Sequence, residues 1–196
     1  MQNTSENQIK TWGNKQEELI ASLQLQPLIV VLRPTKEDFL VELTDSFLSK
    51  KLEYLNNVGI KHVEIAWTDI DDWVSLIKKL KQKFPNISLG AASITNDIAF
   101  KDFQESGLCY AMTPIWNKAL QKKARISEQI LIPGVLTPSE IQNAISFGWK
   151  IIKIFPASTL GLNYIKQIKT PIKSLPFVIA AGGIKSQDID QWLNAG

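Results

Sequence analysis

The chain has 196 residues, of which 44% are apolar and 21% charged, a composition typical of one globular domain with a sizeable core. The net charge of +3 is small and its lysines and arginines are scattered, which argues against a nucleic-acid partner. One cysteine, Cys109, excludes an intrachain disulfide, and one histidine, His62, excludes a histidine metal cluster and a Ser-His-Asp triad. The apolar runs are too short to span a membrane and the N-terminus lacks a signal-peptide core, so we expect a cytoplasmic protein with no membrane partner.

The N-terminal segment is predicted to be helical over residues 6–24, where Leu19, Ile20 and Leu23 lie on one side. We assign residues 1–26 to this helical extension and residues 27–196 to one (β/α) domain. In that domain, apolar runs typical of buried strands alternate with segments of helical spacing, including 42–57 and 71–83. The seven predicted strands are 28–33, 62–67, 88–93, 108–114, 129–135, 150–156 and 177–183.

Turn and cap signals separate these elements. Thr137, followed by Pro138, predicts the start of a helix, while Gly107 and Gly148 predict left-handed helix ends before the next strand. Cys109 lies in an apolar run and is predicted to be a small buried side chain.

Seven βα repeats favour a TIM-type (β/α) barrel over a doubly wound open sheet. The first strand ends without the G-x-G-x-x-G of a dinucleotide-binding fold. A complete barrel has eight strands, so we expect the eighth to be missing from this chain.

Two charged residues lie inside apolar strands, where an unpaired charge is costly. Glu64 is in the second predicted strand and Lys153 in the sixth. Because inward-facing side chains of a barrel come in layers from alternate strands, the two could face each other across the interior. Lys150, of opposite parity to Lys153 and at the strand's start, is expected to be solvated.

This pair has two interpretations. It is either a buried ion pair that only fixes strand register, or a lysine whose lowered pKa suits attack on a carbonyl, beside a carboxylate that moves protons.

Several motifs resemble the KDPG/KHG aldolase family, that is, the 2-keto-3-deoxy-6-phosphogluconate and 4-hydroxy-2-oxoglutarate aldolases. The likeness runs from about residue 27 to 196 and includes features of the 2-keto-3-deoxy-6-phosphogalactonate branch. Its motifs occur in the family's order: 27–33 (PLIVVLR), 90–93 (GAAS), 113–114 (TP), 132–140 (IPGVLTPSE), 153–158 (KIFPAS) and 180–184 (AAGGI).

The resemblance implies roles for individual residues. Lys153 would form the imine with a 2-keto acid and Glu64 would shuttle protons, with no metal or organic cofactor. Arg33 would contact an anionic part of the substrate; the alternative is a surface charge at the end of a strand. Ser93 would hold the pyruvate carboxylate and Pro114 would line the pocket.

The glycines of the last motif are implied to bind phosphate. Gly182 and Gly183 would offer backbone N–H groups, as loops after the seventh strand do in many barrels; the alternative is a plain tight turn.

The chain also departs from the family. Thr68 stands where KDPG aldolases carry an arginine that grips the substrate carboxylate, and the bulky Trp67 precedes it. The phosphogalactonate branch also lacks that arginine.

We therefore expect a class I (Schiff-base) aldolase that cleaves a 2-keto-3-deoxy-6-phospho sugar acid to pyruvate and glyceraldehyde 3-phosphate. The alternatives are cleavage of 4-hydroxy-2-oxoglutarate to pyruvate and glyoxylate, and a catalytically degenerate barrel that binds a 2-keto acid or a protein partner. By family analogy, we expect a homo-oligomer, specifically a trimer.

Overall fold

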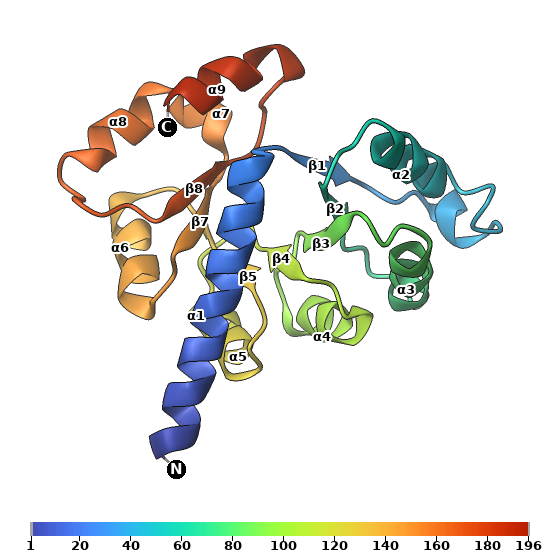
Figure 1. The fold of residues 1–196 in the computed structure, drawn as a ribbon, viewed down its shortest axis with the longest axis horizontal. Coiled ribbons are helices and arrows are strands. Elements are labelled where there is room, and N and C mark those ends of the chain that lie inside the picture. The colour runs from blue at the N-terminus through green and yellow to red at the C-terminus, as the bar shows by residue number, and fades with distance from the viewer. Residues whose placement is uncertain (1, 196) are drawn as a thin grey trace.

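The protein has an α/β fold in which parallel strands alternate with helices (Figure 1). The computed structural model describes residues 2–195, with side chains from residue 11 onward. The strands are β1 (Ile29–Leu32), β2 (His62–Ala66), β3 (Ser88–Ala92), β4 (Tyr110–Met112), β5 (Leu131–Ile132), β6 (Gly134–Val135), β7 (Ile151–Ile154) and β8 (Phe177–Ala180). The helices are α1 (Gln2–Leu25), η1 (Lys36–Phe39), α2 (Phe47–Asn57), α3 (Trp73–Lys83), α4 (Asp97–Ser106), α5 (Lys118–Ile126), α6 (Pro138–Phe147), α7 (Ala157–Leu160), α8 (Asn163–Lys169), η2 (Ser186–Asp188) and α9 (Ile189–Ala195).

A strand is present at each of the seven predicted places. The fifth is divided into β5 and β6 at Pro133, which has no N–H to donate to a neighbouring strand. The two paired sets, β1–β5 and β6–β8, are joined through this strand, because Lys153 N donates to Pro133 O at 2.9 Å and Phe155 N to Val135 O at 3.1 Å.

All the strand pairs are parallel and follow chain order, as in a (β/α) barrel. Within residues 2–195 no strand pairs with the outer edge of β1 or of β8. We call the open space between these two strands the seam.

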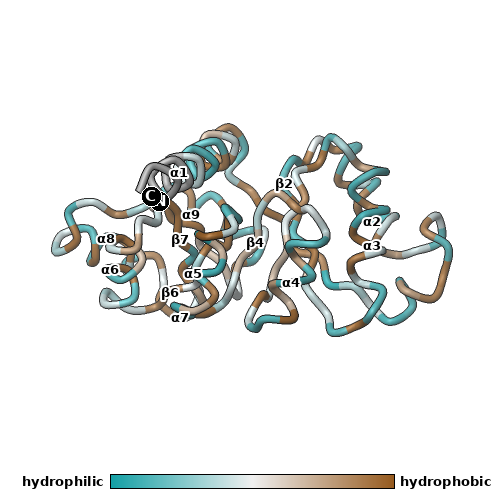
Figure 2. Tube along the Cα trace, turned by 90° about the horizontal axis from the view of Figure 1, so that it is seen from below, coloured by the Kyte–Doolittle hydropathy of each residue, from teal (hydrophilic) through white to brown (hydrophobic). Residues whose placement is uncertain are grey.

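The helices lie in two groups, one over each half of the sheet. Helices α2, α3 and α4 lie on one side and α1, α5, α6 and α9 on the other, as both views show (Figures 1 and 2). Each group covers its own cluster of buried apolar side chains. Leu52, Ile65 and Phe103 belong to the first cluster, and Trp12 and Ile152 to the second.

Local capping signals explain most helix boundaries. Thr137 and Glu140 form a capping box at the start of α6, and Gly148 ends that helix with φ 99°, as its sequence predicts. The helix predicted over 42–57 begins later, at Phe47, because the side chain of Ser46 caps it by accepting from Ser49 N at 3.2 Å. The prediction for Cys109 was wrong: its side chain is exposed, since it lies in a bend before β4 rather than within the strand.

Helix α1 lies against the amino-terminal ends of the strands. Its Trp12 Nε1 donates to Gln129 O at 3.0 Å, just before β5, and its Gln16 Oε1 accepts from Lys150 N at 2.8 Å, just before β7. Ser22 Oγ lies 3.2 Å from the Nε2 of His62, the first residue of β2. The carboxyl ends of the strands, where barrel enzymes place their chemistry, are therefore at the opposite end from α1.

No helix in the described part of the chain is long and apolar enough to cross a membrane.

Candidate active site

The two charged residues singled out in the sequence are both buried among the strands. Glu64 is the third residue of β2 and is 2% exposed, while Lys153 is the third residue of β7 and is 7% exposed. Every residue of both strands is buried, so the surrounding walls are dry on both faces. The structure thus brings together the lysine and the carboxylate that the sequence predicts as partners.

Burial dominates the protonation of this pair. It raises the pKa of Glu64 to about 7, against the opposing attraction of Lys153. Burial also lowers the pKa of Lys153, helped by the nearby positive charge of Arg33 and opposed by Glu64. Burial therefore favours the neutral form of each group, and a neutral amine is the form that nucleophilic attack requires.

The pair does not behave as a tight structural ion pair. No contact within 4.0 Å joins the Lys153 nitrogen to Glu64 among the ion pairs of the described residues. Lys153 Nζ instead lies 5.2 Å from the centre of the Phe155 ring, and Glu64 Oε1 is buried without a hydrogen-bond partner among the described residues. A buried register-fixing pair would be expected to satisfy both groups, so this geometry favours the chemical interpretation.

Lys150 is different although it is only three residues away. Its ammonium pairs with Glu17 of α1 and its side chain is 49% exposed, as the parity of the strand predicts. It provides a reference for an ordinary lysine that lies just before the same strand.

The remaining predicted residues all follow the carboxyl ends of strands. Arg33 follows β1 and is exposed, but it is near enough to influence the charge of Lys153. The loop after it is held by buried Asp38, which accepts from Thr35 N at 2.9 Å and Leu48 N at 2.8 Å. Burial alone would raise the pKa of Asp38, but its hydrogen bonds lower it, so this anchor stays ionised.

Ser93 and Pro114 lie after the neighbouring strands β3 and β4. Ser93 is half-buried and has φ 67°, a left-handed conformation that non-glycine residues rarely adopt and that tends to occur at binding sites. Pro114 packs against Gly134 of β6, where an added Cβ would lie 2.4 Å from the Pro114 carbonyl carbon. The close approach of these strand ends therefore depends on glycine at position 134.

The departure at residues 67 and 68 has a simple geometry. Trp67 faces away from the interior, and its Nε1 donates to Asp102 Oδ2 of α4 at 2.8 Å. Thr68 is half-buried two residues beyond the end of β2. The bulky indole is therefore held by α4, and the arginine position is occupied by a small neutral side chain.

Gly182 and Gly183 form a tight turn after β8, with φ 93° and 75°. A Cβ added to Gly182 would lie 2.9 Å from ring atoms of Phe155. A Cβ added to Gly183 would lie 2.1 Å from Ser158 Oγ. The turn is tied to the segment after β7, because Ser158 N donates to Gly182 O at 3.1 Å. Glycine is thus required by packing at both positions, while Gly183 is exposed.

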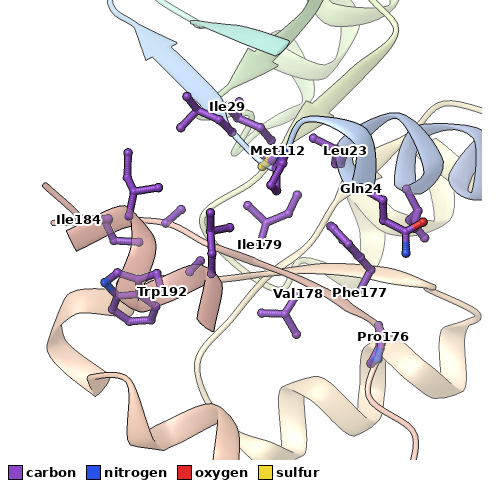
Figure 3. A pocket seen from close by; sticks show the side chains of 18 of the residues that line it. Leu23, Gln24, Ile29, Met112, Pro176, Phe177, Val178, Ile179, Ile184 and Trp192 are labelled. Atoms are coloured by element: carbon purple, nitrogen blue, oxygen red, sulfur yellow. The ribbon is translucent and has the colours of Figure 1, made fainter. Parts of the chain in front are cut away.

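A cavity of about 1080 Å³ runs along the seam. Figure 3 shows Leu23 and Ile29 on one side of it and Ile179 and Ile184 on the other. Glu64, Gly182 and Gly183 also line this cavity, whereas Lys153 and Arg33 do not. It is mainly an apolar opening between β1 and β8, and it extends inward as far as the carboxyl group of Glu64.

Among the buried polar residues that sequence reasoning did not identify, Tyr110 of β4 lies in the same interior as Glu64. Its side chain is fully buried, and its hydroxyl has no partner among the described residues. A tyrosine inside a strand that is otherwise apolar is the signal that could have identified it, because a buried phenol normally finds a hydrogen-bond partner. The structure contains no cluster of three His, Cys, Asp or Glu side chains suited to a metal ion within the residues it describes.

Parallel strands in chain order, with a buried lysine and a buried carboxylate among them, are typical of enzymes with an α/β fold of the (β/α)-barrel class. The family model of the KDPG and KHG aldolases matches residues 19–196, and the chain belongs to that family. It is therefore an aldolase by family, a carbon–carbon lyase.

Individual relatives agree with this assignment. The chain is 26% identical over 171 residues to the 2-dehydro-3-deoxy-6-phosphogalactonate aldolase of Escherichia coli K12, covering 87% of this chain and 79% of that protein. It is 24% identical over 186 residues to the KHG/KDPG aldolase of the same organism, covering 94% and 81%. A crystal structure of the KDPG aldolase of Legionella pneumophila, with pyruvate captured as a covalent carbinolamine, superimposes with a TM-score of 0.71 at 27% identity, covering 85% and 77%.

Proposed function

We propose that the protein is a class I aldolase that cleaves a 2-keto-3-deoxy-6-phospho sugar acid to pyruvate and glyceraldehyde 3-phosphate, with Lys153 as the imine-forming residue. The observation that carries this proposal is the buried Lys153 amine, whose pKa is lowered by burial, in the same enclosure as Glu64. The E. coli relatives act on substrates of this chemical class, as their names state.

The chemistry begins with attack of the neutral Lys153 amine on the C2 carbonyl of the substrate, which gives a carbinolamine. Loss of water gives an iminium ion, which withdraws electrons from C3. The C4 hydroxyl then loses its proton, the C3–C4 bond breaks, and its electrons form an enamine as the aldehyde leaves. Protonation at C3 and addition of water release pyruvate and return the free amine.

Glu64 is assigned the proton transfers of this sequence. With a pKa of about 7, it gives and accepts a proton near neutral pH with little cost in either direction. It would take the C4 hydroxyl proton and return a proton to C3.

The residues at the strand ends are assigned to the anionic parts of the substrate. Ser93 and Thr68 offer hydroxyl groups near the carboxyl ends of β3 and β2, Pro114 closes the pocket wall, and the Arg33 guanidinium suits a carboxylate or phosphate. Gly182 and Gly183 offer backbone N–H groups to a phosphate beside the seam.

Borohydride reduction in the presence of pyruvate tests the imine directly. We expect a stable carboxyethyl adduct, mapped by mass spectrometry to the peptide containing Lys153. A Lys153→Ala protein should give no adduct, while Lys150→Ala should give the parental amount. An unchanged protein mass after reduction would reject imine chemistry and would leave the catalytically degenerate barrel as the better proposal.

The open seam favours a second candidate substrate, 4-hydroxy-2-oxoglutarate, because this keto acid has no phosphate group and so does not depend on contacts beside Gly182 and Gly183, where the outer edges of β1 and β8 have no strand partner among the described residues. Comparing pyruvate release from this keto acid and from the phosphorylated sugar acids separates the two. Faster release from 4-hydroxy-2-oxoglutarate would assign the enzyme to glyoxylate production.

Three structural proposals accompany this function. We propose that this barrel lacks one of the usual eight strands, so that β1 and β8 present unpaired outer edges to the apolar cavity of the seam. Residues 1–26 act as a helical extension to the catalytic domain of residues 27–196. The assembly is a trimer, which sedimentation of the purified protein would test.

A further inference from the structure

One residue of the interior has no place in the chemistry described so far. Tyr110 lies in the same cross-strand row as Glu64: Glu64 pairs in register with Gly90 of β3, and Gly90 pairs with Tyr110 of β4. Residues in register on adjacent strands point to the same side of a sheet. Both side chains therefore project into the enclosure that contains Lys153.

The middle residue of this row, Gly90, has no side chain, so the side chains of Glu64 and Tyr110 can approach each other. A Cβ built on Gly90 would lie 2.5 Å from Cζ and 2.6 Å from Cε2 of the Tyr110 ring. The outer end of the ring thus leans across β3, and its hydroxyl is directed toward β2 and Glu64. Any larger residue at position 90 would displace the ring.

Two buried polar atoms are left without partners at this place. Tyr110 Oη and Glu64 Oε1 are both shielded from solvent, and neither makes a hydrogen bond within residues 11–195. A buried donor and a buried acceptor that stay unsatisfied are costly, and a single enclosed water that bonds to both removes the cost.

We propose that Tyr110 is a positioning residue for the carboxyl group of Glu64, to which its hydroxyl is hydrogen-bonded through one bridging water. The catalytic consequence of this contact rests on the proposed aldolase function, whereas the contact itself does not. The hydroxyl donates, because burial, together with the nearby carboxyl group of Glu64, raises the pKa of Tyr110 well above its ordinary value and keeps it protonated. Donation to a carboxylate favours its ionised form and so opposes the effect of burial on Glu64.

Other titratable groups also face this part of the interior. Lys153 of β7 opposes the rise in the pKa of Glu64, and Arg33 lowers the pKa of Lys153. His62, two residues earlier on the same face of β2, has its Nε2 3.2 Å from Ser22 Oγ and its Nδ1 buried without a partner among the described residues, and burial lowers its pKa. His62 pairs in register with Ser88, whereas Tyr110 belongs to the row of Glu64 itself.

The test is a pH titration of the Glu64 carboxyl by infrared difference spectroscopy, with the band assigned by its loss in Glu64→Gln. In Tyr110→Phe, which keeps the ring, we expect the midpoint to rise by about 1 pH unit, the size of a hydrogen bond to a charged group. Tyr54→Phe, which changes an exposed tyrosine of α2, serves as the matched control and should leave the midpoint unchanged. A parental midpoint in Tyr110→Phe overturns the proposal, even if that protein melts at a lower temperature.

The kinetic consequence is measured separately. The acid limb of kcat/KM should move to higher pH by the same amount in Tyr110→Phe, with near-parental rates above it. Failure of pyruvate trapping in the parent would reject the aldolase function but leave the titration result valid. A shifted titration with an unshifted acid limb would show that the contact exists and has no role in turnover, and would overturn the positioning role.

Discussion

Two regions of the sheet, strands β2 and β7, which we call the closed wall, and strands β1 and β8 at the seam, differ in how far their apolar residues are buried. Strands β2 and β7 have neighbours on both sides and are buried at every residue. Strands β1 and β8 have a neighbour on one side only: Val31 of β1 is 46% exposed, and every residue of β8 is partly exposed. Strand neighbours, rather than hydrophobic composition alone, decide where the interior is dry.

This difference divides the proposed chemistry. The groups that need desolvation, Lys153 and Glu64, belong to the closed wall, where burial shifts both pKa values. The groups proposed to bind anions, Arg33, Gly182 and Gly183, flank the seam, where water and substrate have access. Changes on the closed wall should therefore affect the chemical steps, and changes beside the seam should affect binding.

The largest effect is expected at Lys153. Replacing it by alanine removes the nucleophile, so pyruvate release should fall at least about 10³-fold. Lys150→Ala, which changes an exposed lysine just before the same strand, should retain parental turnover. If the Lys153→Ala protein were as active as the parent, the nucleophile would lie elsewhere. The closed wall could then no longer be assigned the chemical steps.

Glu64→Gln should lower kcat by roughly 10²-fold, since a positioned proton-transfer group contributes about that much.

The same substitution should also change how the stability of the protein depends on pH. The pKa of Glu64 rises from 4.5 to about 7 on folding, so the folded state retains a proton that the unfolded state loses. The free energy of unfolding should then decrease as pH rises through this window, on the order of 1–3 kcal/mol.

That slope should be absent in Glu64→Gln, as chemical denaturation at a series of pH values would show. An identical slope in both proteins would mean that the carboxyl is not desolvated, and that the closed wall is wetter than its burial indicates.

Amide hydrogen exchange sharpens the comparison at the backbone. The seam-facing amides of β1 and β8 have no strand partner among the described residues, so they should exchange roughly 10–100-fold faster than those of β2 and β7. Equal protection, measured by mass spectrometry, would indicate that another segment already pairs with the seam.

The smallest effect is expected at Arg33. Because its guanidinium is exposed, Arg33→Ala should raise KM for a phosphorylated substrate by roughly 5-fold, with kcat little changed. Arg33→Lys should recover part of the affinity by restoring the charge. A fall in kcat without a change in KM would assign Arg33 to the chemical step instead.

Much of the fold was predictable because the local signals are strong. The seven apolar runs, the cap at Thr137 and the left-handed glycine Gly148 all formed the predicted elements. The start of α2 was predicted less well, because Ser46 and the buried Asp38 fix it through contacts eight residues apart. Likewise, Cys109 is exposed because the strand begins two residues later than the apolar run suggests.

For the site, charge and strand parity were enough to single out Lys153 and Glu64 and to separate Lys150 from them. Tyr110 could not be found in this way, because its relation to Glu64 passes through the missing side chain of Gly90 on an intervening strand. Similarly, Trp67 stands out in the sequence as a bulky departure, but its hydrogen bond to Asp102 turns it toward α4.

By itself, the amino-acid sequence determined the alternation of strands and helices and the presence of two charges in apolar strands, since both follow from local patterns of hydrophobicity. The tertiary structure alone decided that these charges share one buried enclosure, that Tyr110 leans toward Glu64 across Gly90, and that the outer edges of β1 and β8 have no strand partner within residues 2–195. The physical reason is that desolvation and strand pairing are set by neighbours distant in the chain, which local sequence does not specify.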